Sequence, residues 1–259
     1  MGNPLIAQNV IQEDLNRIVE WTKDWLLTLN IDKCTVLHIG CNNPKKEYVV
    51  NSKKLRSVDS QKDLGITITH NLKWDKHIIN ITRRANSMLY LIRKAFLHID
   101  KELFVRLYKS YVRPILEYGF QIWSPYFQKD ITLLEKTQRR ATKMVTGLSK
   151  LQYEQRLKCL ELTTLDARRQ RGDLIETYKV LTGYYNVPKI RAVFVLNKNE
   201  KLRGHSLKLS RTSATSNPRL HYLPNRVVNA WNKLPQTVIS APSVNSFKNQ
   251  LDKYLSQVL

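Results

Sequence analysis

The first seventy residues show one helical pattern followed by three short extended patterns. Between Ala7 and Leu27, apolar residues recur every three or four positions, which predicts an amphipathic helix. A polar turn follows, and residues 34–40 then alternate as a strand. Further strands are expected at residues 47–50, which open a hairpin, and from Asp63 to Thr69. The pattern therefore predicts a helix and about three antiparallel strands.

From about residue 71 the apolar period becomes helical. Helices are predicted over residues 77–96, 101–119, 130–147, 151–162 and 163–183. Pro114 is expected to kink the second of these helices, because proline cannot donate a backbone hydrogen bond. Asp130 and Gly147 are expected to cap the two ends of the third. Thr163 and Asp166 form a start like a capping box for the last.

Near Pro188 the pattern becomes less regular. Short strands are expected at residues 193–198 and 206–213, and two short helices separated by prolines close the chain. We therefore expect a mainly α protein with a small N-terminal α+β piece. Its four predicted parts are residues 1–70, residues 71–147, residues 148–185 and the mixed segment 186–259.

The charge balance adds a functional expectation. The chain of 259 residues holds 43 Lys and Arg against 21 Asp and Glu, a net charge of +22. Hydrophobic residues make up 42%, enough for a packed core, so a disordered chain is excluded. Surface cations in this excess attract polyanions, most often nucleic acid. A ribosome-like protein or a protein bound to a membrane surface is the alternative.

Cysteine usage and the N-terminal pattern bear on location. Cys34, Cys41 and Cys159 are too few for a disulfide framework, which suggests a reducing compartment. The sequence shows no signal peptide, and no stretch is apolar enough to span a bilayer. We expect an intracellular protein of the nucleus or cytoplasm without a membrane partner, and the oligomeric state is left open.

Few residues have the spacing that metal sites or catalysis require. Cys34, His38 and Cys41 match three ligands of a zinc knuckle, but no fourth follows closely, which favours a packed strand. The sequence contains no nucleophile elbow and no phosphate-cradling glycine loop. It also lacks an adjacent pair of aspartates, so a two-metal centre is not expected. We therefore expect no metal site and no cofactor in this chain.

Basic residues gather instead on the predicted helices. The candidate nucleic-acid-binding residues are Arg83, Arg84, Arg93, Lys94, Lys136, Arg139, Arg140, Lys143, Arg168, Arg169 and Arg171. One such run is usually an ordinary solvated face, but several with few acids favour a surface that follows phosphates. Tyr90 and Tyr108 either stack on bases or pack in the core.

Five ordered runs resemble reverse transcriptases of non-LTR retrotransposons of the jockey/CR1 kind. The downstream palm of that family resembles "LNRIVEWTKDWLLTLNIDKCTVLHIG", and its next block resembles "KDLGITITHNLKWDKHIINITRRANSMLYLIRKAF". The region beyond the palm is similar to "LYKSYVRPILEYGFQIWSPYFQKDITLLEKTQRRATKMVTGL". The end of such reading frames is similar to "YEQRLKCLELTTLDARRQRGDLIETYKVLTG" and "NRVVNAWNKLPQTVISAPSVNSFKNQLDKYL". The resemblance covers nearly the whole chain.

The resemblance implies roles for two motifs. "NIDKC" is similar to motif D, in which Lys33 would act near the pyrophosphate of the incoming nucleotide, as a general acid. "DLGI" is similar to motif E, the primer grip, formed here by Asp63, Leu64, Gly65 and Ile66. Residues 1–70 would then be a partial palm and residues 71–147 a thumb-like region.

The family's metal-binding carboxylates lie upstream of motif D and have no counterpart here. We therefore expect a truncated RNA-directed DNA polymerase without an endonuclease. It would use Mg²⁺ only with an intact parent site and would bind RNA, RNA–DNA hybrid or DNA without polymerising. One alternative is an active polymerase completed in trans by the rest of the retroelement enzyme. The other is an interaction or structural relic in which Trp123 and Tyr126 would be exposed anchors, although core packing is the expected state of both.

Overall fold

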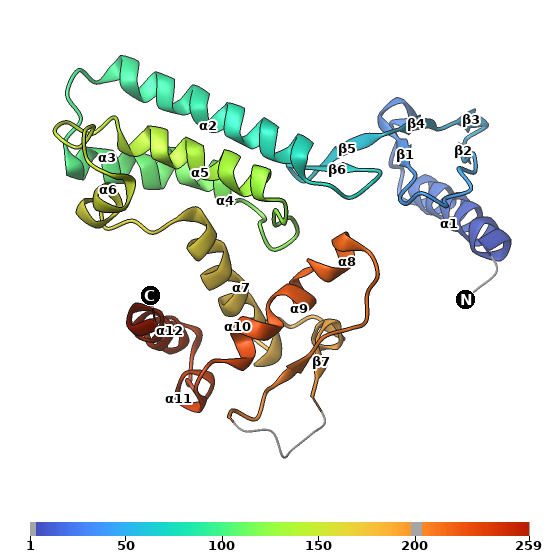
Figure 1. Ribbon diagram of the computed structural model, residues 1–259. Coiled ribbons are helices and arrows are strands. Elements are labelled where there is room, and N and C mark those ends of the chain that lie inside the picture. Colours follow the sequence, from blue (N-terminus) through green and yellow to red (C-terminus); the bar gives the residue numbers. More distant parts are fainter. Residues whose placement is uncertain (1–3, 198–203, 259) are drawn as a thin grey trace. The chain divides into compact units, whose positions relative to one another are not determined.

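The computed structural model describes residues 4–197 and 204–258 (Figure 1). The chain divides into two compact units, Met1–His77 and Ile78–Leu259. Both consist of helices and two-stranded sheets, so the predicted mainly α fold is confirmed. The four-part division made from the sequence stays a prediction.

The first unit contains one long helix, α1 (Pro4–Asp24), and a single 3₁₀ turn, η1 (Ile31–Lys33), within its described residues. Its strands are β1 (Thr35–Leu37), β2 (Val49–Val50), β3 (Lys53–Lys54), β4 (Arg56–Val58), β5 (Ser60–Asp63) and β6 (Ile66–Thr69). Pairs β2–β3 and β5–β6 are antiparallel, but β1 and β4 are parallel. The prediction of antiparallel strands is therefore wrong for β1. Residues 38–55 provide a connection long enough for a crossover.

The core of the first unit is small. Val19 of α1 packs against Tyr48, Val50 and Leu55. The side-chain amide of Gln12 extends this contact, because it donates to Val49 O at 2.8 Å and accepts from Val49 N at 3.0 Å. Other apolar positions of the predicted face, including Ile18, Trp21 and Trp25, are exposed. The core therefore uses only part of the apolar face that the period predicted.

The second unit begins with a run of helices. They are α2 (Asp75–Ala95), which starts just before the unit boundary, α3 (Lys101–Leu107), the π-helical segment η2 (Tyr108–Val112), α4 (Arg113–Glu117), α5 (Gln128–Thr142), α6 (Tyr153–Cys159) and α7 (Leu165–Leu181). The π-helical segment η2 ends two residues before Pro114, whose missing N–H interrupts the helical ladder.

The remaining elements are short, apart from the last helix. They are η3 (Ile190–Val193), β7 (Val195–Leu196), β8 (Leu209–Ser210), α8 (Asn217–Leu220), α9 (Leu223–Arg226), α10 (Val228–Asn232), α11 (Gln236–Ile239) and α12 (Val244–Val258). Strands β7 and β8 pair antiparallel within the two predicted segments. Lys198, the end of the first predicted strand, lies outside the described residues.

Helix caps differ from the predictions by one or more residues. Asp130 is not the N-cap of α5, because the helix starts at Gln128 and Asp130 lies buried in its first turn. Helix α5 ends at Thr142, and Gly147, with a φ of +81°, lies in the turn beyond it. The cap of α7 is Thr164, whose hydroxyl accepts from Ala167 N at 3.1 Å. Thr163 and Asp166 therefore do not cap this helix.

A buried polar network around Gln138 joins α5 to its neighbours. Gln138 accepts a hydrogen bond from the Tyr108 hydroxyl and donates to the Tyr153 hydroxyl at 2.8 Å. Its amide also donates to Thr163 O at 2.9 Å. Burial raises the pKa of Tyr108 and of Tyr153, so both phenols stay neutral. One side chain thus connects η2, α6 and the start of α7.

Arg226 of α9 bonds to α7 and to the loop before α5. Its guanidinium donates to both carboxylate oxygens of Asp173 at 2.8 Å and to Phe120 O at 3.2 Å. Both members of the ion pair are largely buried. Helix α7, helix α9 and the loop before α5 are therefore held at one point.

The C-terminal core forms around Trp231 and Phe247, both with no exposed surface. His205 lies edge-on to Trp231 and donates from Nε2 to Trp231 O at 3.0 Å. Burial lowers the pKa of His205 below its ordinary value. The imidazole is therefore neutral in the folded protein at neutral pH.

Replacing Gln138 by alanine is expected to lower the free energy of unfolding by about 2 to 4 kcal/mol, because it leaves buried hydroxyl and carbonyl groups without partners. The matched control is Gln128→Ala, at an exposed position in the first turn of the same helix. We expect it to change that free energy by less than about 0.5 kcal/mol. Urea unfolding measures both, and equal losses would contradict the role of the network.

Stability is expected to fall as the pH drops through the ordinary histidine pKa of 6.5. Below pH 6.5, His205 is protonated in the unfolded chain, whereas the buried imidazole stays neutral in the folded protein. Protonation therefore stabilises the unfolded state, and the free energy of unfolding falls. His205→Gln should flatten the fall in unfolding free energy between about pH 7.5 and pH 5.5. The control is His98→Gln, at an exposed position. A slope unchanged in His205→Gln would show that this histidine does not contribute.

Candidate nucleic-acid interface

Lys33 lies at the end of η1 in the first unit. Asn30 caps this turn by accepting from Lys33 N at 3.2 Å, and β1 begins two residues later, at Thr35. The Lys33 side chain is exposed, whereas the neighbouring Asp32 pairs with Lys53. Lys33 therefore lies in the turn that leads into β1, and its catalytic role stays a prediction.

The four primer-grip candidates form the tip of one hairpin. Asp63 and Ile66 are partners in the β5–β6 register, and Leu64 and Gly65 make the two-residue turn between them. Their φ angles of +44° and +85° are those of a type I′ turn, which needs positive φ at both positions. The Leu64 side chain is 81% exposed, whereas Ile66 is buried. The tip is therefore a projecting feature, and its contact with a primer stays a prediction.

Eight of the predicted cations lie on α2, in the C-terminal half of α5 and at the residue that follows it. They are Arg83, Arg84, Arg93, Lys94, Lys136, Arg139, Arg140 and Lys143, all of them exposed. Helix α2 buries its opposite face through Ile78, Ile81, Ala85 and Ile92, whereas Phe96, the next apolar residue after the helix, is 37% exposed. We call these eight residues the basic surface.

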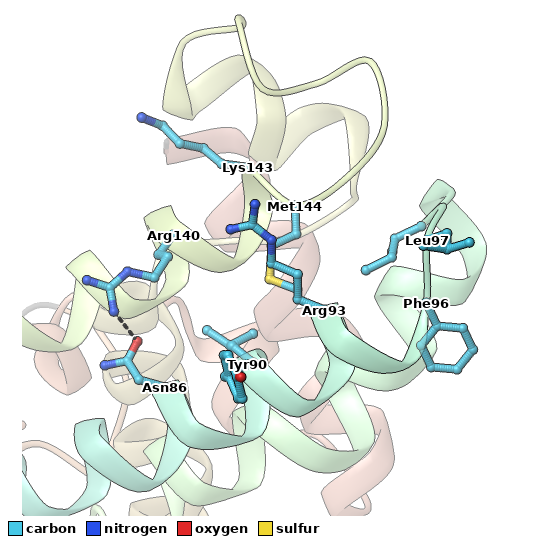
Figure 2. Close-up of a pocket in the computed structure, with 10 residues that line it drawn as sticks. Asn86, Tyr90, Arg93, Phe96, Leu97, Arg140, Lys143 and Met144 are labelled. Atoms are coloured by element: carbon cyan, nitrogen blue, oxygen red, sulfur yellow. Dashed lines mark hydrogen bonds between the residues drawn. The ribbon is translucent and has the colours of Figure 1, made fainter.

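A pocket of about 690 Å³ lies between α2 and the end of α5 (Figure 2). Cations from both helices line it, namely Arg93, Arg140 and Lys143. Arg140 Nη1 donates to Asn86 Oδ1 at 2.7 Å, which links the two helices. Among the described residues that line the pocket, none is acidic. We call it the α2–α5 pocket.

Several lining residues of this pocket were not among the sequence candidates. They are Asn86, Leu89, Phe96, Leu97, Ile99 and Met144. Asn86 lies one turn before Tyr90, so the helical period could have found it. Tyr90 lines the pocket with an exposed ring, whereas Tyr108 is buried in the polar network. Only the first of these two tyrosines is therefore accessible to a base.

The three α7 arginines are placed differently. Arg168 forms a two-point ion pair with Glu117 of α4, and Arg171 does so with Asp252 of α12. Arg169 is 3% exposed and pairs with Asp166 at 3.0 Å. These cations neutralise acids and hold α7 to its neighbours. The structure thus separates them from the basic surface, and their predicted contact with nucleic acid is left without support.

Arg156 of α6 is a residue that sequence reasoning missed. Its buried guanidinium donates to Thr142 Oγ1 at 2.9 Å and to Arg139 O at 3.3 Å. It also donates to Leu151 O at 2.5 Å. These bonds secure the last turn of α5, which carries part of the basic surface. No local signal marks Arg156, because its partners come from outside α6.

Trp123 is a core residue, as expected, and not the exposed anchor that the relic alternative requires. Its side chain is fully buried, and its indole N–H donates to Tyr118 O at 2.7 Å. Tyr126 is partly buried and stacks on His221, with ring centroids 4.7 Å apart. This segment therefore packs against the rest of the unit.

In residues 4–197 and 204–258, no group of three or more His, Cys, Asp or Glu side chains is arranged to hold a metal ion. In the same ranges, no helix has both the length and the apolar character needed to cross a bilayer.

Arg168→Gln is expected to lower the free energy of unfolding by about 1 to 2 kcal/mol, because Glu117 loses a two-point partner in a partly buried site. Its affinity for nucleic acid should stay within about twofold of the wild type. The matched change Arg83→Gln, on the basic surface, should leave stability unchanged and weaken binding. Urea unfolding and anisotropy titration separate the two effects, and the reverse pattern would contradict both assignments.

The chain has distant relatives among curated proteins. It is 25% identical over 149 residues to the RNA-directed DNA polymerase from mobile element jockey of Drosophila melanogaster, across 55% of this chain and 16% of that protein. The probable RNA-directed DNA polymerase from transposon X-element of Drosophila melanogaster is 23% identical over 148 residues, across 54% of this chain and 16% of that protein. An uncharacterized protein of Caenorhabditis elegans is 27% identical over 134 residues, across 51% of this chain and 68% of that protein.

No model of a known protein family matches the chain, and no solved structure matches it. The matches to the two polymerases span about half of this chain and a small part of each polymerase. The chain is therefore a distant relative of the RNA-directed DNA polymerases of mobile elements.

Proposed function

We propose that this chain corresponds to the C-terminal part of a non-LTR retrotransposon reverse transcriptase and binds RNA or RNA–DNA hybrid through the basic surface. The observation that carries the proposal is the α2–α5 pocket, where cations from two helices meet without an acidic lining residue among those described. The distant relationship to polymerases of mobile elements supports the same conclusion.

The geometry of the basic surface suits a nucleic-acid backbone. Arg83 and Arg93 are ten residues apart on α2, so they lie about 15 Å apart along the helix axis. Lys136, Arg140 and Lys143 follow one another at spacings of one turn on and just after α5. Two rows of cations of this length can contact several successive phosphates. Arg139 belongs to the same region, with its guanidinium over the Tyr153 ring and 3.8 Å from Glu154.

Affinity from such contacts depends on released counterions. Binding should therefore weaken steeply with salt and show little base preference. RNA and hybrid duplexes, with A-form geometry, would be distinguished from B-form DNA by shape and by the 2′-hydroxyl groups. In this proposal, α2 and α5 belong to a thumb-like region of the parent polymerase.

Lys33 and the β5–β6 tip are proposed as the counterparts of motif D and the primer grip. Two-metal nucleotide transfer needs clustered carboxylates, and the sequence contains no adjacent aspartate pair. Alone, this chain is therefore proposed to bind its substrate without extending it. Polymerisation with Mg²⁺ would require the carboxylates of the complete parent enzyme.

The test is an anisotropy titration of a hybrid duplex between about 50 and 200 mM salt. Arg140→Glu combined with Lys143→Glu should weaken binding at least about tenfold and reduce the log–log salt slope by about two units. The matched control is Lys233→Glu combined with Lys253→Glu, an equal charge change at exposed C-terminal positions. This control should stay within about threefold of the wild type.

Two outcomes would contradict the proposal. Equal weakening by both double variants would show that net charge, not the basic surface, determines the affinity. A primer-extension assay with Mg²⁺ in the same buffer tests the chemistry, and nucleotide incorporation by the purified chain would contradict the proposed loss of catalysis.

A further inference from the structure

We infer that the α2–α5 pocket seats one unpaired nucleotide of a bound strand, with its base against Tyr90 and the apolar floor and its phosphate among the cations. This inference rests on the proposed function, because it names the nucleic-acid feature that the basic surface prefers. It goes further, because contacts with phosphates alone would need no pocket between the helices.

The floor of the pocket suits the face of a base. Leu89 and Ile99 are almost fully buried beneath it, and Met144 is partly buried at its side. Tyr90 adds an aromatic ring that is 63% exposed. In a fully paired duplex the bases are stacked inside and only the backbone faces outward. An apolar floor of this kind therefore matches a base that has left the stack.

The polar groups are distributed unevenly around the pocket. Figure 2 shows the Asn86–Arg140 contact at one end and Phe96 and Leu97 at the other, with Tyr90 and Arg93 between them. The hydrogen bond to Asn86 positions the Arg140 guanidinium at the polar end. One end is thus suited to a phosphate and the other to an apolar ring, which together describe a nucleotide.

Size and charge point to the same ligand. The volume of about 690 Å³ lies within the range of about 300 to 1,000 Å³ that is typical of small-molecule sites. A neutral apolar ligand would leave Arg93, Arg140 and Lys143 without a counter-charge. A nucleotide supplies both the flat apolar face and the negative charge.

The nucleotide is assigned to a strand rather than to a free pool because the cations continue beyond the pocket. Arg83 lies about one turn before Asn86 on α2, and Lys136 lies one turn before Arg140 on α5. Both are exposed and can contact the neighbouring phosphates of the same strand. A free mononucleotide would not use them.

The experiment compares three hybrid duplexes in anisotropy titrations of the full chain. One is blunt, one carries a single unpaired nucleotide, and the third carries an abasic unit at that position. The unpaired nucleotide should strengthen binding about tenfold over the blunt duplex, as expected for one stacked base. The abasic unit should lose this gain, because it keeps the phosphate and lacks the ring.

Two tyrosine variants test whether the stronger binding of the duplex with an unpaired nucleotide depends on the pocket. Tyr90→Ala should remove the gain and leave the affinity for the blunt duplex within about twofold. The matched control Tyr111→Ala removes a similarly exposed tyrosine outside the pocket lining and should keep the gain. An unchanged urea midpoint confirms that both variants are folded, as expected for side chains at exposed positions.

The results that would contradict this inference differ from the result that would contradict the proposed function. Equal binding of the three duplexes by the wild type would overturn the inference and leave the proposed phosphate surface standing. Loss of the gain in both tyrosine variants would also overturn it. Displacement of the unpaired duplex by millimolar AMP would overturn the assignment to a strand, because the pocket would then take free nucleotides. Failure to bind even the blunt duplex would instead overturn the proposed function.

Discussion

The guanidinium of Arg156, buried beneath the last turn of α5, makes the hydrogen bonds on which the α5 part of the basic surface depends. Its hydrogen bonds go to a hydroxyl and to two backbone carbonyls, Arg139 O and Leu151 O. A buried cation is costly unless hydrogen bonds surround it, and carbonyls at a helix C-terminus carry partial negative charge. The same partial charge favours the cations that gather at this end, including Arg140 and Lys143. One internal cation thus fixes the turn that presents the external ones.

Acidic residues are scarce in this chain, and in the second unit several of them serve the structure. Glu117 and Asp252 each receive a two-point contact from an α7 arginine, and Asp173 receives one from Arg226. Because these carboxylates are used between helices, their charge does not offset the cations of α2 and α5. Ion pairs therefore join α7 to α4 and α12, whereas most of the exposed cations of the basic surface lie on α2 and at the end of α5.

Periodicity was sufficient to predict the helical segments between residues 77 and 183, since these depend on local spacing, but it missed the four-residue helix α8. It could not assign the α7 arginines, because Asp252 lies 81 residues from Arg171 along the sequence. The parallel pairing of β1 with β4 is a long-range property of the same kind. Asp130 was mistaken for a cap because its residue type suits that position, whereas the helix starts earlier and buries it. The pocket needed the structure, since its two walls are separate helices.

The contrasting burial of the tryptophans has a spectroscopic consequence. Trp21 and Trp25 of the first unit are more than half exposed, whereas Trp123 and Trp231 of the second have no exposed surface. Indole emission shifts to the red in water, and a soluble quencher reaches only exposed rings. The fifth tryptophan, Trp74 of the first unit, is partly buried, so the fully buried emitters both belong to the second unit. Unfolding of the second unit can be followed by its own red shift, separately from the first.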